Sequence, residues 1–331
     1  MKKIYKRFNY YFQYAVYRYL ADMKYFLIGL LFACSHYVLR AQVKKDTFIN
    51  VGNKIITLAE VVVSNKLNVP AFITRIKNDT SFYKAFRNLH VIHFNAINDI
   101  RMVDKKGNNT ASLFSHTKQK IENGCRTMEI IDEIVTGDMY THAKEFNYYT
   151  ANMYASLFFT KGNICGETNT VKAVEFSTTG KSGMEKHKEQ LKMLFFNPGK
   201  KIKGLPFMSG KTAIYDDDIA DSYDMQIDWE RHNSNDCYVF KQKVKENKRG
   251  TVVVDEMTTW FNDSTYEVVA RNYTLSYDAA VYDFKVMMEV EMTKFGELQI
   301  PSLIKYNGNW KAIFKKRERG IFTAILSDFK K

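Results

Sequence analysis

Alternation of apolar and polar residues dominates the last third of the chain. Its clearest run places apolar side chains at every second position, with mostly charged residues between them: Tyr282, Phe284, Val286, Met288, Val290 and Met292. A period of two residues indicates an antiparallel strand with one buried face. We expect further strands over residues 223–230, 238–245, 251–261, 266–277, 298–306, 309–316 and 320–329. Eight successive strands without a helix between them predict a meander: a curved sheet, a half-barrel or a barrel.

The dipeptide Asn307-Gly308 is the strongest short hairpin signal in the chain. Asparagine and glycine both accept the positive φ angles that a type I′ turn requires. We therefore expect a tight turn there, between the strands predicted over 298–306 and 309–316.

The N-terminal half has a mixed pattern. Apolar residues recur at helical spacing from Asn68 to about Asn88, and a second helix is predicted near 145–160. A strand is expected between them, over 89–102, which would place His90 and His93 on opposite faces. Other predicted elements are a β-branched strand within 55–63, a hairpin at 104–107 leading into 110–118, and a helix over 184–195.

Together these patterns predict an α+β, β-dominant fold. Helices from a mixed region, 42–211, would pack on a C-terminal antiparallel meander, 212–331. The two regions form either one domain or two, and the glycine- and proline-containing stretch 197–211 is the best boundary.

A secretion signal begins at Met23. One lysine precedes an apolar run over 25–34, and Ala41 supplies the small residue at the cleavage position. We therefore expect cleavage after Ala41, so that the mature chain begins at Gln42. Residues 1–41 would comprise an upstream extension and the signal peptide.

The signal predicts export to the periplasm or outer membrane of a Gram-negative bacterium. One alternative is a lipoprotein anchored at Cys34, because 31–34 resembles a lipobox. Another is a retained membrane anchor, which the polar pair Ser35-His36 disfavours because it interrupts the apolar run too early.

The net charge of the chain does not indicate nucleic-acid binding. The whole chain carries a formal charge of +13, and the charge falls to +7 without residues 1–41, which hold seven basic residues and one acidic. Much of the remaining excess lies in 311–319, which is either a solvated basic strand and turn or a contact with anionic lipid. No nucleic-acid recognition motif is present.

Two short motifs resemble phosphate loops, at 177–182 and 210–212. Each lacks the glycine required upstream: Glu175 and Leu205 stand at those positions. We therefore predict no nucleotide binding. No zinc-protease helix and no serine nucleophile elbow is found either, so the sequence predicts no reaction.

Two clusters offer further chemistry. Cys125, Cys165 and Cys237 remain in the mature chain at no zinc-ligand spacing. We favour a disulfide between Cys125 and Cys165, with three buried thiols as the alternative. Asp216, Asp217 and Asp218 are either a solvated acidic loop or oxygen ligands for calcium, although their spacing fits no EF-hand.

The 282–292 face is the best candidate ligand site. Its methionine and aromatic side chains are apolar and adaptable in shape. The face therefore serves either as part of the core or as an apolar groove for an acyl chain. The residues we assign to such a groove are Phe284, Met288 and Met292, with Trp229 and Trp260 as its walls.

An exported chain with early helices and a long meander over 222–329 is similar to the periplasmic lipoprotein carriers of the Lol type. The resemblance is architectural and carries no shared motif. It implies a half-barrel, lidded by helices, that shelters acyl chains. Fold similarity alone does not assign function.

We therefore expect a non-catalytic cell-envelope protein that binds an apolar or lipid-like ligand or a lipidated partner. A lipoprotein or an envelope or outer-membrane protein would be its partner. The first alternative is an envelope-glycan hydrolase, because its two carboxylates would meet only in space and leave no local spacing. The second is a structural or surface-interaction protein without a small ligand.

Overall fold

The computed structural model describes residues 47–52, 54–59, 62–63, 67–171, 193–202, 208, 210–278, 282–312 and 316–331. The predicted signal, Cys34, the cleavage position and the 177–182 motif lie outside these residues, as does most of the helix predicted over 184–195.

The strands in chain order are β1 (Thr47–Val51), β2 (Lys54–Leu58), β3 (His93–Val103), β4 (Asn109–Glu122), β5 (Cys125–Gly137), β6 (Ile164–Cys165), β7 (Tyr223–His232), β8 (Asn235–Val244), β9 (Val254–Asn262), β10 (Val268–Asp278), β11 (Tyr282–Phe295), β12 (Leu298–Ala312) and β13 (Glu318–Lys330). The helices are α3 (Val69–Asn78), α4 (Ser81–Asn88), α5 (Tyr149–Phe158) and α7 (Asp217–Ala220), with 3₁₀ turns η1 (Leu89–Val91) and η2 (Glu246–Lys248).

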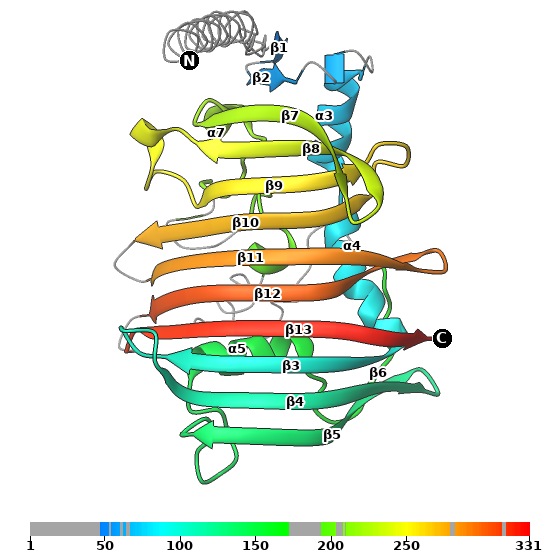
Figure 1. Ribbon diagram of the computed structural model, residues 1–331, viewed down its shortest axis with the longest axis vertical. Helices are drawn as coiled ribbons and strands as arrows, with labels where there is room; N and C mark the ends of the chain where they lie inside the picture. The colour runs from blue at the N-terminus through cyan, green and yellow to red at the C-terminus, as the bar shows by residue number, and fades with distance from the viewer. Residues whose placement is uncertain are drawn as a thin grey trace, which may run out of the picture. The chain divides into compact units, whose positions relative to one another are not determined.

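Within the described residues, all thirteen strands belong to one sheet, ordered β1-β2-β7-β8-β9-β10-β11-β12-β13-β3-β4-β5-β6. The strands β7 to β13 form an antiparallel meander, which Figure 1 shows in yellow to red. β13 then pairs with β3, and β2 pairs in parallel with β7. Elements of the predicted mixed region therefore extend the meander at both edges. The predicted α+β, β-dominant class is confirmed, and the sheet is open between its edge strands β1 and β6.

The helices cover one face of this sheet. α3 begins where Asn68 accepts a hydrogen bond from the backbone of Ala71, and its apolar side chains Phe72, Ile73 and Ile76 are buried against the strands. α4 packs on β12, and α5 packs on β13. In Figure 1 these three helices lie behind the sheet. Among the described helices, none combines the length and apolarity needed to cross a membrane.

The single helix predicted up to Asn88 is two helices. At Asp79 the backbone is extended, with φ −65° and ψ 131°. The Asp79 carboxylate accepts hydrogen bonds from the backbone N and the hydroxyl of Ser81, at 3.1 and 3.0 Å. These bonds satisfy donors at the start of a new helix, so α4 begins there and takes a different direction.

The hairpin predicted at Asn307-Gly308 is wrong. β12 runs without a break through this dipeptide, and Gly308 pairs with Val286 on one side and Gly320 on the other. The Tyr306 ring occupies the space that a Cβ at 308 would need, and it stacks on Phe322 with centroids 4.7 Å apart. Here glycine admits an aromatic ring into the core instead of making a turn. The meander accordingly has seven strands rather than eight.

Two features of the N-terminal half also differ from prediction. β5 was not predicted, because its side chains are mostly exposed on both faces and show no alternation of burial. The strand predicted over 89–102 begins only at His93, and His90 lies in η1. The two histidines are therefore not on opposite faces of one strand.

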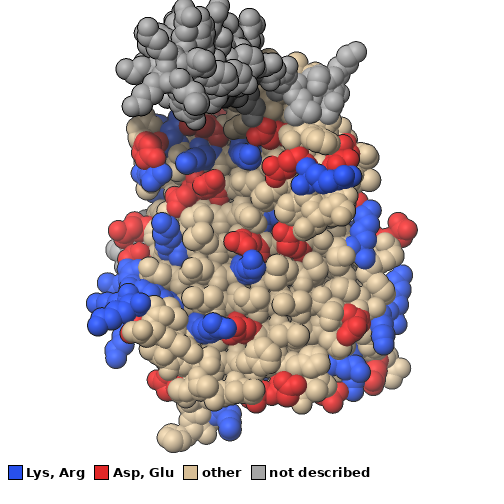
Figure 2. Space-filling view, viewed as in Figure 1, with Lys and Arg blue, Asp and Glu red and all other residues tan. Residues whose placement is uncertain are grey.

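The other face of the sheet has no helix in Figure 1, and Figure 2 shows charged side chains scattered among uncharged ones over it. Several large apolar side chains are exposed there, including Ile97, Phe114 and Ile325 at 43%, 41% and 48%. The inner face is instead filled by aromatic side chains. Examples are the stacked pairs Phe284–Trp310 and Tyr306–Phe322.

Candidate functional site

The predicted groove residues do not form one site. Phe284 and Met288 point inward from β11, and each is only 2% exposed. Met288 borders a gap of about 10 Å³ between β11, β12 and α5. Met292, farther along the strand, borders a separate open groove of about 590 Å³ at the tips of three hairpins.

The two tryptophans assigned as walls lie on opposite faces of the sheet. Trp229 pairs with Tyr238, whose ring packs against Phe72 of α3, so Trp229 faces the helices. Trp260 lies against the His232 ring, with the ring planes tilted by 31°, and it packs with a small apolar cluster on the other face, around Cys237, Val239 and Val269. One ligand cannot contact both tryptophans as walls of a single groove.

A different pocket lies between α4, α5 and the strands β13, β3 and β4. Its volume is about 40 Å³, and most of its wall is apolar. The apolar lining includes Phe86, Leu89, Phe94, Leu157, Phe158 and Leu326. Four polar side chains complete the lining: His90, Asn98, Gln119 and Arg126. We call this cavity, with its polar side, the amphipathic pocket.

Arg126 organises the polar side of the pocket. Its Nε lies 2.7 Å from Glu167 Oε2, and Nη1 donates to Thr160 Oγ1 at 2.6 Å and to Gln119 Oε1 at 3.4 Å. The amide of Gln119 donates in turn to the backbone oxygens of Leu89 and Ile92, which ties β4 to the turn that carries His90.

His90 completes this network. Its Nδ1 lies 2.8 Å from Glu167 Oε1. Burial, reinforced by the charge of Arg126, lowers the pKa of His90 to about 4. The imidazole is therefore neutral at pH 7, and its Nδ1–H donates to the carboxylate. Burial opposes ionisation of Glu167, but the hydrogen bonds from Arg126 and His90 and the charge of Arg126 outweigh it and lower the pKa of Glu167.

Among the side chains that line the pocket, the one cation is Arg126, which is paired with Glu167, and the imidazole is neutral. Arg87, outside the lining, has Nη1 3.4 Å from His90 Nδ1 and donates through Nη2 to the backbone oxygen of Thr168. Because the cation in the lining is already paired, the polar side suits an uncharged hydrogen-bonding group, such as an ester or a hydroxyl.

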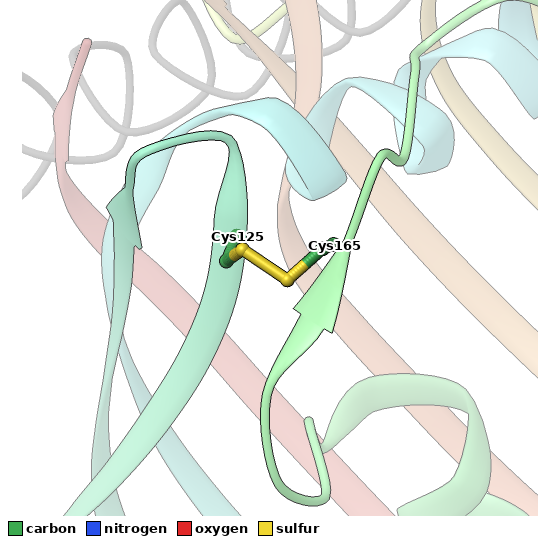
Figure 3. The surroundings of a disulfide bond; sticks show 2 residues. All are labelled: Cys125 and Cys165. Atoms are coloured by element: carbon green, nitrogen blue, oxygen red, sulfur yellow. A yellow bond between two sulfur atoms is a disulfide. The ribbon is translucent and has the colours of Figure 1, made fainter.

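A disulfide holds the backbone segments that carry Arg126 and Glu167 close together. Cys125 and Cys165, the pairing favoured from the sequence, are bonded and join β5 to β6 (Figure 3). Arg126 directly follows the first cysteine, and Glu167 comes two residues after the second. The covalent link therefore fixes the backbone on both sides of the Arg126–Glu167 ion pair.

α5 forms one wall of the pocket. The backbone N–H groups of Tyr149 and Thr150 donate to the Glu318 carboxylate at 2.9 and 2.7 Å, which anchors the first turn of the helix. At its other end, Leu157 and Phe158 border both the amphipathic pocket and the gap beside Met288. Displacing these two side chains would join the two spaces.

No protein-family model matches the chain, and no curated protein matches it. Two solved structures align with 76% of the chain. One is a DUF1329 family protein from Desulfovibrio piger, with 13% identity, 93% of its own chain covered and a TM-score of 0.23. The other is a domain from Vibrio parahaemolyticus named for outer membrane lipoprotein sorting, with 10% identity, 91% coverage and a TM-score of 0.23. The second of these is named for lipoprotein sorting, as are the carriers that the sequence resembles.

The predicted calcium ligands have separate surroundings. Asp217 pairs with Lys54 at 2.9 Å, and Asp216 lies 3.9 Å from Lys201. In the described ranges no three side chains of the metal-binding types come together. Calcium binding by residues 216–218 therefore stays a prediction.

Sequence reasoning missed the polar side of the pocket altogether. His90, Gln119, Arg126 and Glu167 come from four segments and share no spacing. The one available signal was the favoured disulfide, because it brings the residues beside Cys125 and Cys165 together.

Proposed function

We propose that this chain is an exported, non-catalytic cell-envelope protein that binds a lipid-like amphiphile in the amphipathic pocket. The apolar chain would lie under α4 and α5, and an uncharged polar group would face Arg126 and His90. One observation carries the proposal: a mostly apolar cavity that ends in a hydrogen-bonding cluster, in which the lining cation Arg126 is paired with Glu167. That combination is typical of ligand sites, where a few polar groups orient a mostly apolar ligand.

The present volume sets a condition on binding. About 40 Å³ admits only a short apolar group, well below the roughly 300 Å³ or more of ordinary ligand pockets. A longer acyl chain therefore requires Leu157 and Phe158 to swing aside and open the gap beside Met288. Because Phe158 is shared by both cavities, its ring is the barrier to this opening.

The test is native mass spectrometry of the intact exported protein with 1-lauroylglycerol, an uncharged single-chain lipid. We expect a one-to-one adduct that becomes at least several-fold more abundant in Phe158→Ala, because that change merges the cavities. Phe114→Ala is the matched control, since this ring is exposed on the opposite face. It should leave the adduct unchanged.

Two results would reject the proposal. One is the absence of an adduct in both the wild type and Phe158→Ala, with folding of the variant checked by near-ultraviolet circular dichroism. The other is an equal response to Phe158→Ala and Phe114→Ala, which would place the lipid elsewhere. A lipid that co-purifies from the envelope would identify the natural ligand. Envelope-glycan hydrolysis and a purely structural role stay predictions.

A further inference from the structure

An open groove crosses the ends of three hairpins. The turns after β7, β9 and β11 lie at the same end of the sheet (Figure 1), and residues from these hairpins line a space of about 590 Å³. This volume falls within the roughly 300–1,000 Å³ of ordinary ligand pockets, so a ligand needs no opening movement to enter. Four side-chain amides belong to the lining: Asn233, Asn235, Asn262 and Gln299. We call this space the hairpin groove.

Three of these amides are each held by one of their two polar atoms. Asn262 Oδ1 accepts hydrogen bonds from the backbone N–H groups two and three residues later, at 3.1 and 2.9 Å. Asn235 Nδ2 donates to the backbone oxygen of Asn233 at 3.1 Å, and Asn233 Nδ2 donates to Glu291 Oε2 at 2.9 Å. In the part of the chain that the structure describes, the other atoms form no hydrogen bond: Asn262 Nδ2, Asn235 Oδ1 and Asn233 Oδ1. The groove therefore presents one donor and two acceptors on amides that are already fixed.

Hydroxyl and apolar side chains complete the lining. Thr293 is half-buried on β11, and its hydroxyl likewise forms no hydrogen bond with a described residue. Val269 and Met292 supply apolar surface, and Val269 belongs to the small apolar cluster against which Trp260 packs. Donors, acceptors and apolar atoms side by side match a sugar ring, which carries hydroxyls around its rim and C–H groups on its faces.

The charged side chains at the groove are engaged with partners. Glu267 and Lys294, which are the charged residues among the described lining, pair with each other at 2.7 Å. Outside the lining, Arg75 of α3 donates through Nη2 to the backbone oxygen of Thr265 at 2.7 Å. Glu291, behind Asn233, lies 2.9 Å from His232 Nε2. Because the charges in the lining are paired with each other, the groove suits an uncharged ligand better than an anion or a cation.

The place of the groove in the sheet argues against a peptide strand as the ligand. Each of the strands β7 to β12 already pairs with a neighbour on both sides. A peptide strand joins a sheet at a free edge, where backbone groups are unpaired. The hairpin groove offers side-chain atoms instead, so its ligand must be recognised through side-chain hydrogen bonds.

We propose that the hairpin groove binds an uncharged oligosaccharide. Each sugar hydroxyl both donates and accepts, so neighbouring hydroxyls can accept from Asn262 Nδ2 and donate to Asn233 and Asn235. An acetamido substituent would add an amide for the polar atoms and a methyl group for Met292. Among the described lining residues, none is shared between this groove and the amphipathic pocket. The two proposals therefore stand or fall independently.

The experiment is isothermal titration of the intact protein with two uncharged trisaccharides. Triacetylchitotriose carries acetamido groups, and cellotriose has the same linkage with hydroxyls in their place. We expect binding that Asn233→Gly weakens about five- to tenfold, because this change removes an acceptor for a sugar hydroxyl. Thr293→Val keeps the β-branched shape that suits a strand and should weaken binding about threefold or more, because it removes one hydroxyl.

Ser234→Gly is the matched control. Asn233 and Ser234 are neighbours in the turn between β7 and β8, with φ angles of 44° and 67°. Glycine adopts positive φ readily, so both substitutions suit the backbone and add similar freedom to the same turn. Ser234 is not part of the groove lining, so its variant should bind like the wild type. Near-ultraviolet circular dichroism checks that all three variants are folded.

Binding that is weakened by Asn233→Gly and not by Ser234→Gly supports the site. A preference for triacetylchitotriose would then identify acetamido sugars as the ligand class, and equal binding of the two trisaccharides would identify the hydroxyls as the recognised groups. Binding of neither trisaccharide overturns the proposal, as does an equal response to the two glycine variants.

Discussion

The buried imidazole of His90 should make the protein sensitive to acid in a way that one substitution removes. His90 is neutral in the fold because burial and the charges of Arg126 and Arg87 oppose protonation, while Glu167 favours it. His90→Asn keeps a donor close to the position of Nδ1 but cannot take up a proton. The pair of proteins therefore isolates the titration of a single ring.

The magnitude follows from the change in pKa on folding. The pKa of His90 falls from about 6.5 in the unfolded chain to about 4 in the fold. A depressed folded pKa means that the unfolded state takes up the proton first, so stability is complete above pH 6.5 and is lost as the pH falls towards 4. At 1.36 kcal/mol per pKa unit, the wild type should lose about 3 kcal/mol near pH 4 that His90→Asn retains.

The assay is urea denaturation of both proteins at pH 7.5, 6.5, 5.5 and 4.5, followed by tryptophan fluorescence. The difference in the free energy of unfolding between wild type and variant should change steadily below pH 6.5. Acidic groups remote from position 90 titrate alike in both proteins and cancel in this difference, whereas Glu167, which contacts His90, contributes to it. Parallel pH profiles would refute the reasoning, because they would mean that His90 is already protonated or solvated in the fold.

Two further predictions concern stability. The Cys125→Ser/Cys165→Ser pair should lower the free energy of unfolding by about 4 kcal/mol, because the disulfide closes a loop with a sequence separation of 40; an unchanged urea midpoint would contradict this. Gly308→Ala should cost about 1–3 kcal/mol in thermal denaturation, since the new methyl group collides with the Tyr306 ring, and a neutral result would mean that the ring moves freely.

Local pattern predicted most of the strands and helices for a clear reason. Strand side chains alternate between faces, so the inward residues of β11, such as Phe284 and Met288, could be recognised without knowing any neighbour. The same logic failed at β5, which lies between β4 and the two-residue edge strand β6 and has mostly exposed side chains on both faces. It also failed at Gly308, where the packing of Tyr306 overrode turn chemistry.

The candidate sites were beyond such reasoning. Trp229 and Trp260 both carry suitable chemistry, yet strand register puts them on opposite faces of the sheet. Arg126 showed no distinguishing signal in the sequence. Its importance arises from burial and from the partners that the fold supplies to its guanidinium.

The sequence by itself determined the class of fold and the inward face of β11, because periodicity reflects backbone geometry over a few neighbouring residues. Only the tertiary structure decided that β13 pairs with β3 and that Cys125 meets Cys165, which brings His90, Arg126 and Glu167 to one cavity. These contacts join residues distant along the chain. They depend on the packing of the whole sheet and on the low polarity of its core, and neither is encoded in any single segment.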